Sequence, residues 1–339
     1  MAQSYVHPDG GQHECEILGS GPESEESESN WKACEKNPGH EDFISAQDFI
    51  DNYMTRVKTD KLRDRLKAML DLTVRLRVNW TSPSRPDGYI FSHARGRDKL
   101  RLGSGLIWGV KDPVSNKPCL CSGCDGKTGI KSWKFKVRTA RHVVYDTEEA
   151  TKTKVDLFYD GYSCKAGDRM VTLRGLEVVR SDPDMDCCYM LCVSHDEALA
   201  ERIKSASCCL WDRLDENPDL HASDLDFLLS GGRGADHALI VSHPHGQPKK
   251  ISLGELRDGE PHHAEYNAAT CPGSSGASVF RFVTGRVYVS WFLPIHSGSF
   301  STPYTQQPHQ LSLLTRFLNK LRGREVRLDQ CNYGNWWLL

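Results

Sequence analysis

The chain has 339 residues and a formal net charge of −2. This length suffices for two domains, or for one large two-lobed domain with a sizeable core. A charge so near neutrality gives no overall basic field, so nucleic acid and anionic membranes are not expected partners. No stretch approaches the ~18 uninterrupted apolar residues of a membrane span, and the first ten residues lack the apolar core of a signal peptide. We therefore expect a cytoplasmic or otherwise intracellular protein.

The N-terminal part predicts a tail followed by helices. Gly19 to Asn30 is mostly Gly, Ser and Glu, which favours a disordered acidic tail over residues 1–40. Residues 41–97 are expected to form a helical brace and linker. Ser45 and Asp60 are the expected helix starts, because each precedes apolar residues at helical spacing.

After Val74 the apolar period shortens to that of β-strands. Glycine, aspartate, asparagine and proline separate many short apolar runs, which is typical of an all-β barrel or sandwich. Helical spacing returns at Glu197–Ile203 and at Leu311–Leu321. The clearest strand candidates are Leu102–Val110, Trp133–Val137, Val155–Tyr159, Val171–Val179, Cys187–Val193, Ala238–Ser242, Ser278–Val283 and Val287–Ile295.

Three polar residues stand beside these apolar runs in the order His, Asp, Ser. His142 follows an apolar strand and a Thr-Ala step, and Asp186 directly precedes the run Cys187–Leu191. Ser275 lies between Gly273 and Gly276 on a predicted tight turn. Such a turn exposes a hydroxyl and directs backbone N–H groups into one small space, which suits a nucleophile and an oxyanion.

These motifs resemble those of the trypsin-like (chymotrypsin-fold, PA clan) serine proteases, which carry Thr-Ala-x-His and Gly-x-Ser-Gly. Ser274, where secreted digestive members usually have aspartate, and Ala277 are closer to the intracellular, bacterial and viral branches. The resemblance covers roughly Leu100 to Phe300. It implies a mainly β fold, a double β-barrel with an N-terminal helical extension and a C-terminal helix.

The resemblance also implies how the chain is divided. The protease domain would span residues 98–325. Barrel one would take residues 98–200, barrel two residues 205–305 and the C-terminal helix residues 308–322. A C-terminal tail would follow at residues 326–339.

The family roles apply to the matching residues. Ser275 would attack the scissile carbonyl, His142 would transfer the proton, and Asp186 would orient the imidazole. The amides of Gly273 and Ser275 would form the oxyanion hole. Asp184 competes for the acidic role, but we prefer Asp186 because an unbroken apolar run follows it directly.

The S1 pocket is expected to exclude lysine and arginine. The position at its floor falls at about Ala269, which carries no charge. Thr270 and His296 resemble the pair with which glutamyl endopeptidases and picornaviral proteases bind Glu or Gln at P1. A bulky apolar P1 stays open as an alternative, with His296 beside the pocket.

The expected function is a serine endopeptidase that hydrolyses protein or peptide substrates through an acyl-enzyme. The alternative is a catalytically silent protease fold that serves as a binding or scaffold module, which the departures at Ser274 and Ala277 keep open. The oligomeric state is left open.

The cysteines predict thiols rather than disulfides, because their number, 13, is odd and no export signal is visible. Cys119, Cys121 and Cys124 have metal-ligand spacing, so a structural zinc site and a loop of reduced thiols are both candidate interpretations. No other cofactor is expected. Five residues are candidates for a fourth ligand: Cys164, Cys187, Cys188, Cys192 and His195.

Overall fold

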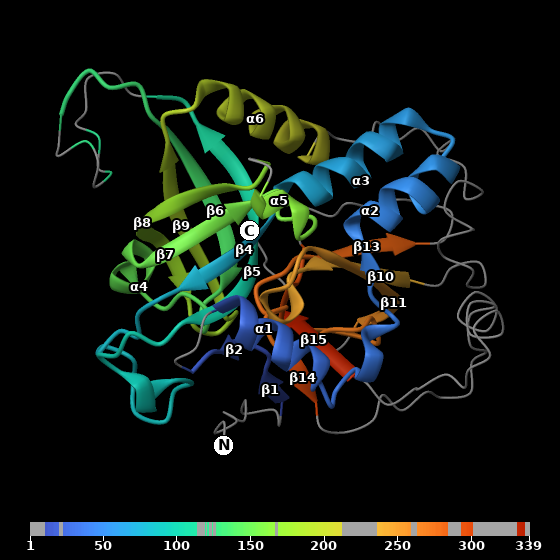
Figure 1. The fold of residues 1–339 in the computed structure, drawn as a ribbon, viewed down its shortest axis with the longest axis horizontal. Coiled ribbons are helices and arrows are strands. Elements are labelled where there is room, and N and C mark those ends of the chain that lie inside the picture. The colour runs from blue at the N-terminus through green and yellow to red at the C-terminus, as the bar shows by residue number, and fades with distance from the viewer. Residues whose placement is uncertain are drawn as a thin grey trace.

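The computed structural model describes residues 11–19, 23–113, 119, 121, 124, 127–166, 169–211, 236–258, 263–283, 293–300 and 331–335. These residues form two antiparallel sheets, one of seven strands and one of eight, with helices around them (Figure 1). The expected mainly β fold with two barrels is confirmed.

The first sheet closes on itself. Its strands pair in the order β5-β4-β7-β8-β9-β6, and β6 pairs back onto β5. The strands are β4 (Thr73–Val78), β5 (Arg101–Lys111), β6 (Trp133–Ala140), β7 (Thr153–Leu157), β8 (Val171–Asp182) and β9 (Cys187–Ser194). Barrel one therefore begins with β4, inside the segment that the sequence assigned to the brace and linker, because the alternating apolar residues of β4 are needed to close it.

The second sheet runs in the order β14-β15-β12-β11-β10-β13, and a bridge between Ser278 and Ile295 brings its two ends together. The strands are β10 (Asp236–Ser242), β11 (Lys250–Asp258), β12 (His263–Tyr266), β13 (Val279–Val283), β14 (Ile295–Phe300) and β15 (Cys331–Asn335). Strand β15 falls in the predicted C-terminal tail, yet it pairs with two strands of barrel two. The predicted C-terminal helix at 308–322 lies outside the described residues.

Three short strands extend the barrels. The strand β1 (Gly11–His13) pairs with β14, β2 (Glu16–Ile17) with β5, and β3 (Ile44–Ser45) with β11. Helix α1 (Glu23–Lys32) follows β2. The prediction of a disordered tail is therefore wrong for residues 11–19 and 23–40. Backbone pairing to exposed strand edges orders a segment that has few apolar side chains to bury.

A buried charge network fastens α1 to barrel one. Arg75 and Arg77 of β4 both contact the carboxylate of Asp156 on β7, which is fully buried. The same two guanidinium groups reach Glu23 in the first turn of α1, at 3.0 and 3.2 Å. Burial alone would raise the pKa of Asp156, but the two arginines lower it to about 2. Because the network is charged and enclosed, it fixes the first turn of α1 on barrel one.

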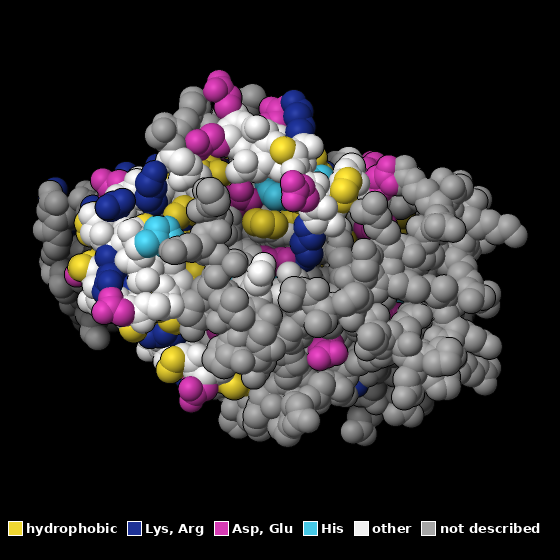
Figure 2. Space-filling model, turned by 90° about the horizontal axis from the view of Figure 1, so that it is seen from below, with side chains coloured by type: hydrophobic (Ala, Val, Ile, Leu, Met, Phe, Trp, Pro, Cys, Tyr) yellow, Lys and Arg dark blue, Asp and Glu magenta, His cyan; other side chains and the backbone are white. Residues whose placement is uncertain are grey.

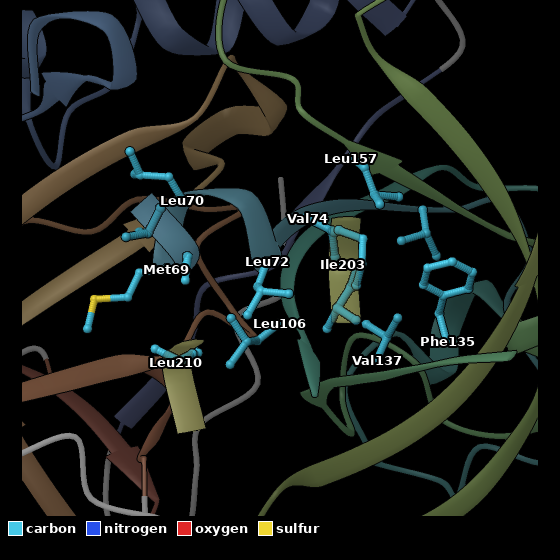
Figure 3. Packing of buried hydrophobic residues seen from close by; sticks show 14 of the residues in the cluster. Met69, Leu70, Leu72, Val74, Leu106, Phe135, Val137, Leu157, Ile203 and Leu210 are labelled. Atoms are coloured by element: carbon cyan, nitrogen blue, oxygen red, sulfur yellow. The ribbon is translucent and has the colours of Figure 1, made fainter. Parts of the chain in front are cut away.

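The remaining helices brace the barrels. Helix α3 runs directly into β4 and packs on α6. Barrel one, the brace and part of barrel two share one hydrophobic core, and Figure 3 shows members of it from α3, α6 and barrel one. No helix among the described residues is long and apolar enough to cross a membrane. Acidic and basic side chains are interspersed on the face seen in Figure 2. The helices are α2 (Ala46–Asp48), which continues into a π-helical turn at Phe49–Tyr53, α3 (Asp60–Leu72), α4 (Thr147–Thr151), α5 (Ser163–Ala166) and α6 (Glu197–Trp211).

Candidate active site

The turn that carries Ser275 is shaped by two glycines. Gly273 has φ of +97° and Gly276 has φ of +89°, a region that side chains rarely adopt. A Cβ on Gly273 would lie 2.7 Å from the carbonyl oxygen of His243, and one on Gly276 would lie 2.2 Å from that of Ser104. Only glycine fits at both positions, so the turn presents Ser275 and its flanking amides in one fixed geometry.

Ser104 of β5 ties this turn to barrel one. Its N–H donates to the carbonyl oxygen of Ser275 at 2.8 Å, and its hydroxyl donates to that of Gly273 at 2.9 Å. Its own carbonyl oxygen accepts from the Thr139 hydroxyl at 2.7 Å. Thr139 lies three residues before His142, so the serine turn and the histidine segment rest on the same strand of barrel one.

His142 and Asp186 are in direct contact. Nδ1 of His142 lies 2.6 Å from one carboxylate oxygen of Asp186, and the backbone N–H of His142 donates to the other at 2.9 Å. An ionised carboxylate only accepts, so the proton of the neutral imidazole sits on Nδ1. Burial alone would raise the pKa of Asp186, but His142 holds it far below its ordinary value.

Asp186 reaches this position from the turn before β9, where its φ is +46°. The competing Asp184 is exposed in the same turn, and its N–H donates to Asp182. The choice of Asp186 as the partner of His142 thus agrees with the geometry, although both residues lie before the strand rather than on it.

The hydroxyl of Ser275 is fully buried and donates to the carbonyl oxygen of Ser297 at 3.3 Å. Nε2 of His142 is also buried, and within the described ranges it has no hydrogen-bond partner. A buried imidazole nitrogen without a partner is costly. In the described part of the chain no hydrogen bond joins it to the Ser275 hydroxyl, and such an acceptor is what a serine hydroxyl needs in order to become a nucleophile.

The chain's own N-terminal segment crosses the site. The carbonyl oxygen of Glu14 accepts from the N–H of Gly273 at 2.8 Å and from that of Ser275 at 3.4 Å. On the preceding residue, His13, the ring stacks on that of His142 with centroids 4.1 Å apart. Burial, and next the neighbouring His142, lower the pKa of His13 to about 4, so its ring is neutral at pH 7. A backbone carbonyl therefore occupies the position that the oxyanion-hole prediction assigned to a substrate.

The side chain of Glu14 enters a polar pocket. Its carboxylate accepts from Nε2 of His296 at 2.8 Å and pairs with the ammonium group of Lys36. Lys36 also donates to the Thr270 hydroxyl at 3.1 Å, and the Tyr266 hydroxyl lies 2.6 Å from Nδ1 of His296. Burial alone would raise the pKa of Glu14, but Lys36 and His296 hold it far below its ordinary value. The pocket is thus built for an anion.

Two of the three predicted pocket residues line this site. Thr270 and His296 do, whereas Ala269 packs with Phe43 and Cys271 in a small hydrophobic cluster. The sequence reasoning missed Glu14 and Lys36. Both lie in the segment predicted to be disordered, and no local motif distinguishes them there.

The cysteine cluster also comes together. Sulfur atoms of Cys119, Cys121 and Cys124 lie 3.7, 3.3 and 3.3 Å from Nε2 of His195. Among the five candidates for a fourth ligand, the geometry selects His195. Its other ring nitrogen lies 3.0 Å from the carbonyl oxygen of Lys131, which fixes the ring with Nε2 toward the thiols.

No family model and no curated protein matches the chain. Among solved structures, it is similar to a crystal structure of the active form of the Rv3671c protease from Mycobacterium tuberculosis. The two are 13% identical, the match covers 80% of this chain and 78% of the other, and the TM-score is 0.35. At this score the likeness carries no weight for function.

The contact between His142 and Asp186 yields a test that needs no substrate. Asp186→Asn would leave an amide beside Nδ1 and favour the wrong tautomer, so phosphonylation of Ser275 by a fluorophosphonate should slow by about 10³-fold or more. Asp184→Asn, which changes an exposed turn residue, should react at the wild-type rate. Equal losses in the two variants would contradict the assignment of Asp186.

Proposed function

We propose that the chain is a serine endopeptidase that hydrolyses peptide bonds on the carboxyl side of glutamate through an acyl-enzyme. One observation carries this proposal. The carbonyl oxygen of Glu14 rests on the amides of Gly273 and Ser275 while its carboxylate fills the pocket of His296 and Lys36. This is the pose that a substrate with P1 glutamate would take.

In the proposed reaction, Ser275 attacks the carbonyl carbon of the P1 residue while Nε2 of His142 accepts its proton. The amides of Gly273 and Ser275 stabilise the oxyanion. His142, held by Asp186, then delivers the proton to the leaving amine as the C–N bond breaks. Water attacks the acyl-enzyme by the same route in reverse, and Ser275 is restored.

The charges of the pocket support an acidic P1. Lys36 and the Nε2–H of His296 both donate to the Glu14 carboxylate, and the His296 side chain is fully buried while that of Lys36 is 23% exposed. An apolar P1 side chain would leave the two donors unpaired in an enclosed site, and glutamine would satisfy His296 but not the ammonium charge. Lysine or arginine would add a second cation beside Lys36. Glutamate meets both donors, and this favours it over the apolar alternative.

One observation favours the second candidate, a catalytically silent module. The chain's own segment fills the cleft, and a cleft that never opens would make the protein a scaffold. The two functions differ in whether Ser275 reacts with an outside electrophile.

The specificity test uses Lys36→Met. In a library of peptides that differ only at P1, wild type should cleave after glutamate, and Ser275→Ala should cleave none. Lys36→Met should lower kcat/KM for P1 glutamate by about 10²-fold, because a buried carboxylate loses its counter-charge, and should change P1 glutamine little. Lys61→Met, at an exposed position of α3, is the matched control.

Two results would contradict the proposal. A profile dominated by lysine or arginine at P1 would exclude the glutamate pocket. Folded wild type that neither cleaves peptides nor reacts with a fluorophosphonate would favour the scaffold.

We also propose a structural zinc ion at the cysteine cluster. Three thiolates and an imidazole form a closed tetrahedral set, and zinc bonds of about 2.3 Å to sulfur and 2.1 Å to nitrogen put the ligand atoms about 3.6 Å apart. The distances of 3.3 to 3.7 Å to His195 agree with this geometry. The ion would hold the loop before β6 against the residue that leads into α6.

Cys121→Ser should remove one equivalent of zinc relative to wild type, measured by mass spectrometry of the metal in reduced protein, and should lower Tm. Cys208→Ser changes an exposed cysteine outside the cluster and should retain the full metal content. An equal zinc content in Cys121→Ser and wild type would contradict the proposed site.

A further inference from the structure

A second set of four ligands lies beside the active site. It consists of Cys34, His40, His245 and Cys271, whose ligand atoms all lie within 4.8 Å of one another. The two sulfur atoms are 3.6 Å apart, close to the edge of about 3.8 Å expected for two thiolates on one zinc ion. We propose that these residues bind a structural zinc ion that fastens the N-terminal segment to barrel two.

The two histidines point to a ligand between them. Nε2 of His40 and Nε2 of His245 are both buried, and within the described part of the chain neither has a hydrogen-bond partner. Burying two imidazole nitrogens without partners costs free energy unless one group binds the lone pairs of both nitrogens. A zinc ion does so with all four groups at once.

The surroundings are those of a metal centre. Nδ1 of His245 lies 2.6 Å from the Glu16 carboxylate, which fixes the tautomer with Nε2 free to coordinate. Asn37 donates its backbone N–H to the sulfur of Cys34 at 3.4 Å and its side-chain amide to that of Cys271 at 3.0 Å. Such N–H donors stabilise thiolates.

The backbone is also bent to present the ligands. His40 has φ of +50° and His245 has φ of +51°, conformations that are uncommon for residues other than glycine. The Trp31 ring stacks on His40 with centroids 3.5 Å apart. A closed set of two thiolates and two imidazoles suits zinc rather than magnesium or calcium, and leaves no position for catalysis.

The proposed metal centre lies where it can position residues of the active site. Cys34 and His40 flank Lys36 in the sequence, and Cys271 lies between Thr270 and the oxyanion turn. The metal would therefore hold Lys36 in the pocket and fix the chain where it enters the Gly273 turn.

The test compares zinc content under reducing conditions. Cys34→Ser and His40→Asn should each lose the one equivalent of zinc bound at the second cluster, and Cys121→Ser should lose the one bound at the first. The double variant that carries both Cys34→Ser and Cys121→Ser should lose both equivalents. Cys208→Ser should lose none. Should the Cys34 variants fail to fold, protein with Cys119, Cys121 and Cys124 all changed to serine and loaded with Co²⁺ should show the absorption of a tetrahedral site with two thiolate ligands. Full zinc in Cys34→Ser, no cobalt signal in that triple variant, or a Cys34–Cys271 disulfide in peptide maps would overturn the proposal.

A different observation carries a second inference, which rests on the proposed function. The chain passes through the site on both sides of Glu14. Residues Gly11–His13 pair with β14, and Glu16–Ile17 pair with β5. Between them, the thiol of Cys15 donates to the carbonyl oxygen of Leu102 at 3.3 Å. We infer that the Glu14–Cys15 peptide bond is cleaved by the chain's own Ser275.

The step balances without any co-reactant except water. The oxygen of Ser275 bonds to the carbonyl carbon of Glu14, the C–N bond to Cys15 breaks, and His142 passes the serine proton to the new amine of Cys15. Water then releases the acid at Glu14. The new N-terminus at Cys15 stays bound to the barrels, because the contacts that hold the segment there lie after the cleaved bond. They are the pairing of β2 with β5, the ion pairs of Glu23 and the four-ligand cluster.

The mass of the intact protein tests this inference. Wild type should yield a chain that begins at Cys15, whereas Ser275→Ala and Glu14→Gln should stay whole. Glu25→Gln, at an exposed position of α1, should be cleaved like wild type. The rate should not depend on protein concentration, and wild type should not cut added Ser275→Ala chain, because the bond is presented within one molecule.

The outcomes separate the two proposals. A wild type that cleaves glutamyl peptides yet keeps Glu14–Cys15 intact overturns self-cleavage and leaves the proposed function standing. A folded wild type that does neither, and that no fluorophosphonate labels, overturns both.

Discussion

The turn between Gly273 and Gly276 is the constraint on which the site depends. Its two left-handed glycines let the backbone pass close to His243 and Ser104 without a clash, and Ser104 then holds it by hydrogen bonds to the carbonyl oxygens of Gly273 and Ser275. Those carbonyl groups are directed toward barrel one, so the amides of the same residues are left to face the cleft. The two amides that bind the carbonyl oxygen of Glu14 are therefore positioned by the same contacts that join this turn to barrel one.

The N-terminal segment shows how a chain of low hydrophobicity can still be ordered. It buries few apolar side chains, so the free energy that orders it comes from backbone pairing to β14 and β5 and from charge. Its charged contacts with the rest of the chain include those of the Glu23 carboxylate with Arg75 and Arg77 and that of the Glu16 carboxylate with His245. Each pair is partly enclosed, and removing one partner would leave the other charge poorly solvated.

This explains what could be predicted from the sequence. Strand alternation and the glycine-bracketed serine are local patterns, and the strands and the turn follow them. The contact of His142 with Asp186 joins residues 44 apart, and it was expected only from the family resemblance. The composition of the N-terminal segment predicts disorder because it contains few apolar side chains to bury. Its order comes instead from contacts with residues far away in the sequence. The place of β15 in barrel two was missed for the same reason. Lys36 carries no local signal either, since its role exists only where Thr270 and Glu14 meet it.

The pocket's charge has a consequence for any later ligand. The Lys36 side chain is about a quarter exposed, at 23%, while the Glu14 side chain that faces it is 5% exposed. If Glu14 leaves, Lys36 and the Nε2–H of His296 are left beside the oxyanion turn with no anion between them. Water can solvate the ammonium only in part, so the pocket favours whichever carboxylate replaces Glu14. Occupancy by the chain's own segment and the proposed selectivity for acidic substrates therefore depend on the same partly buried charge.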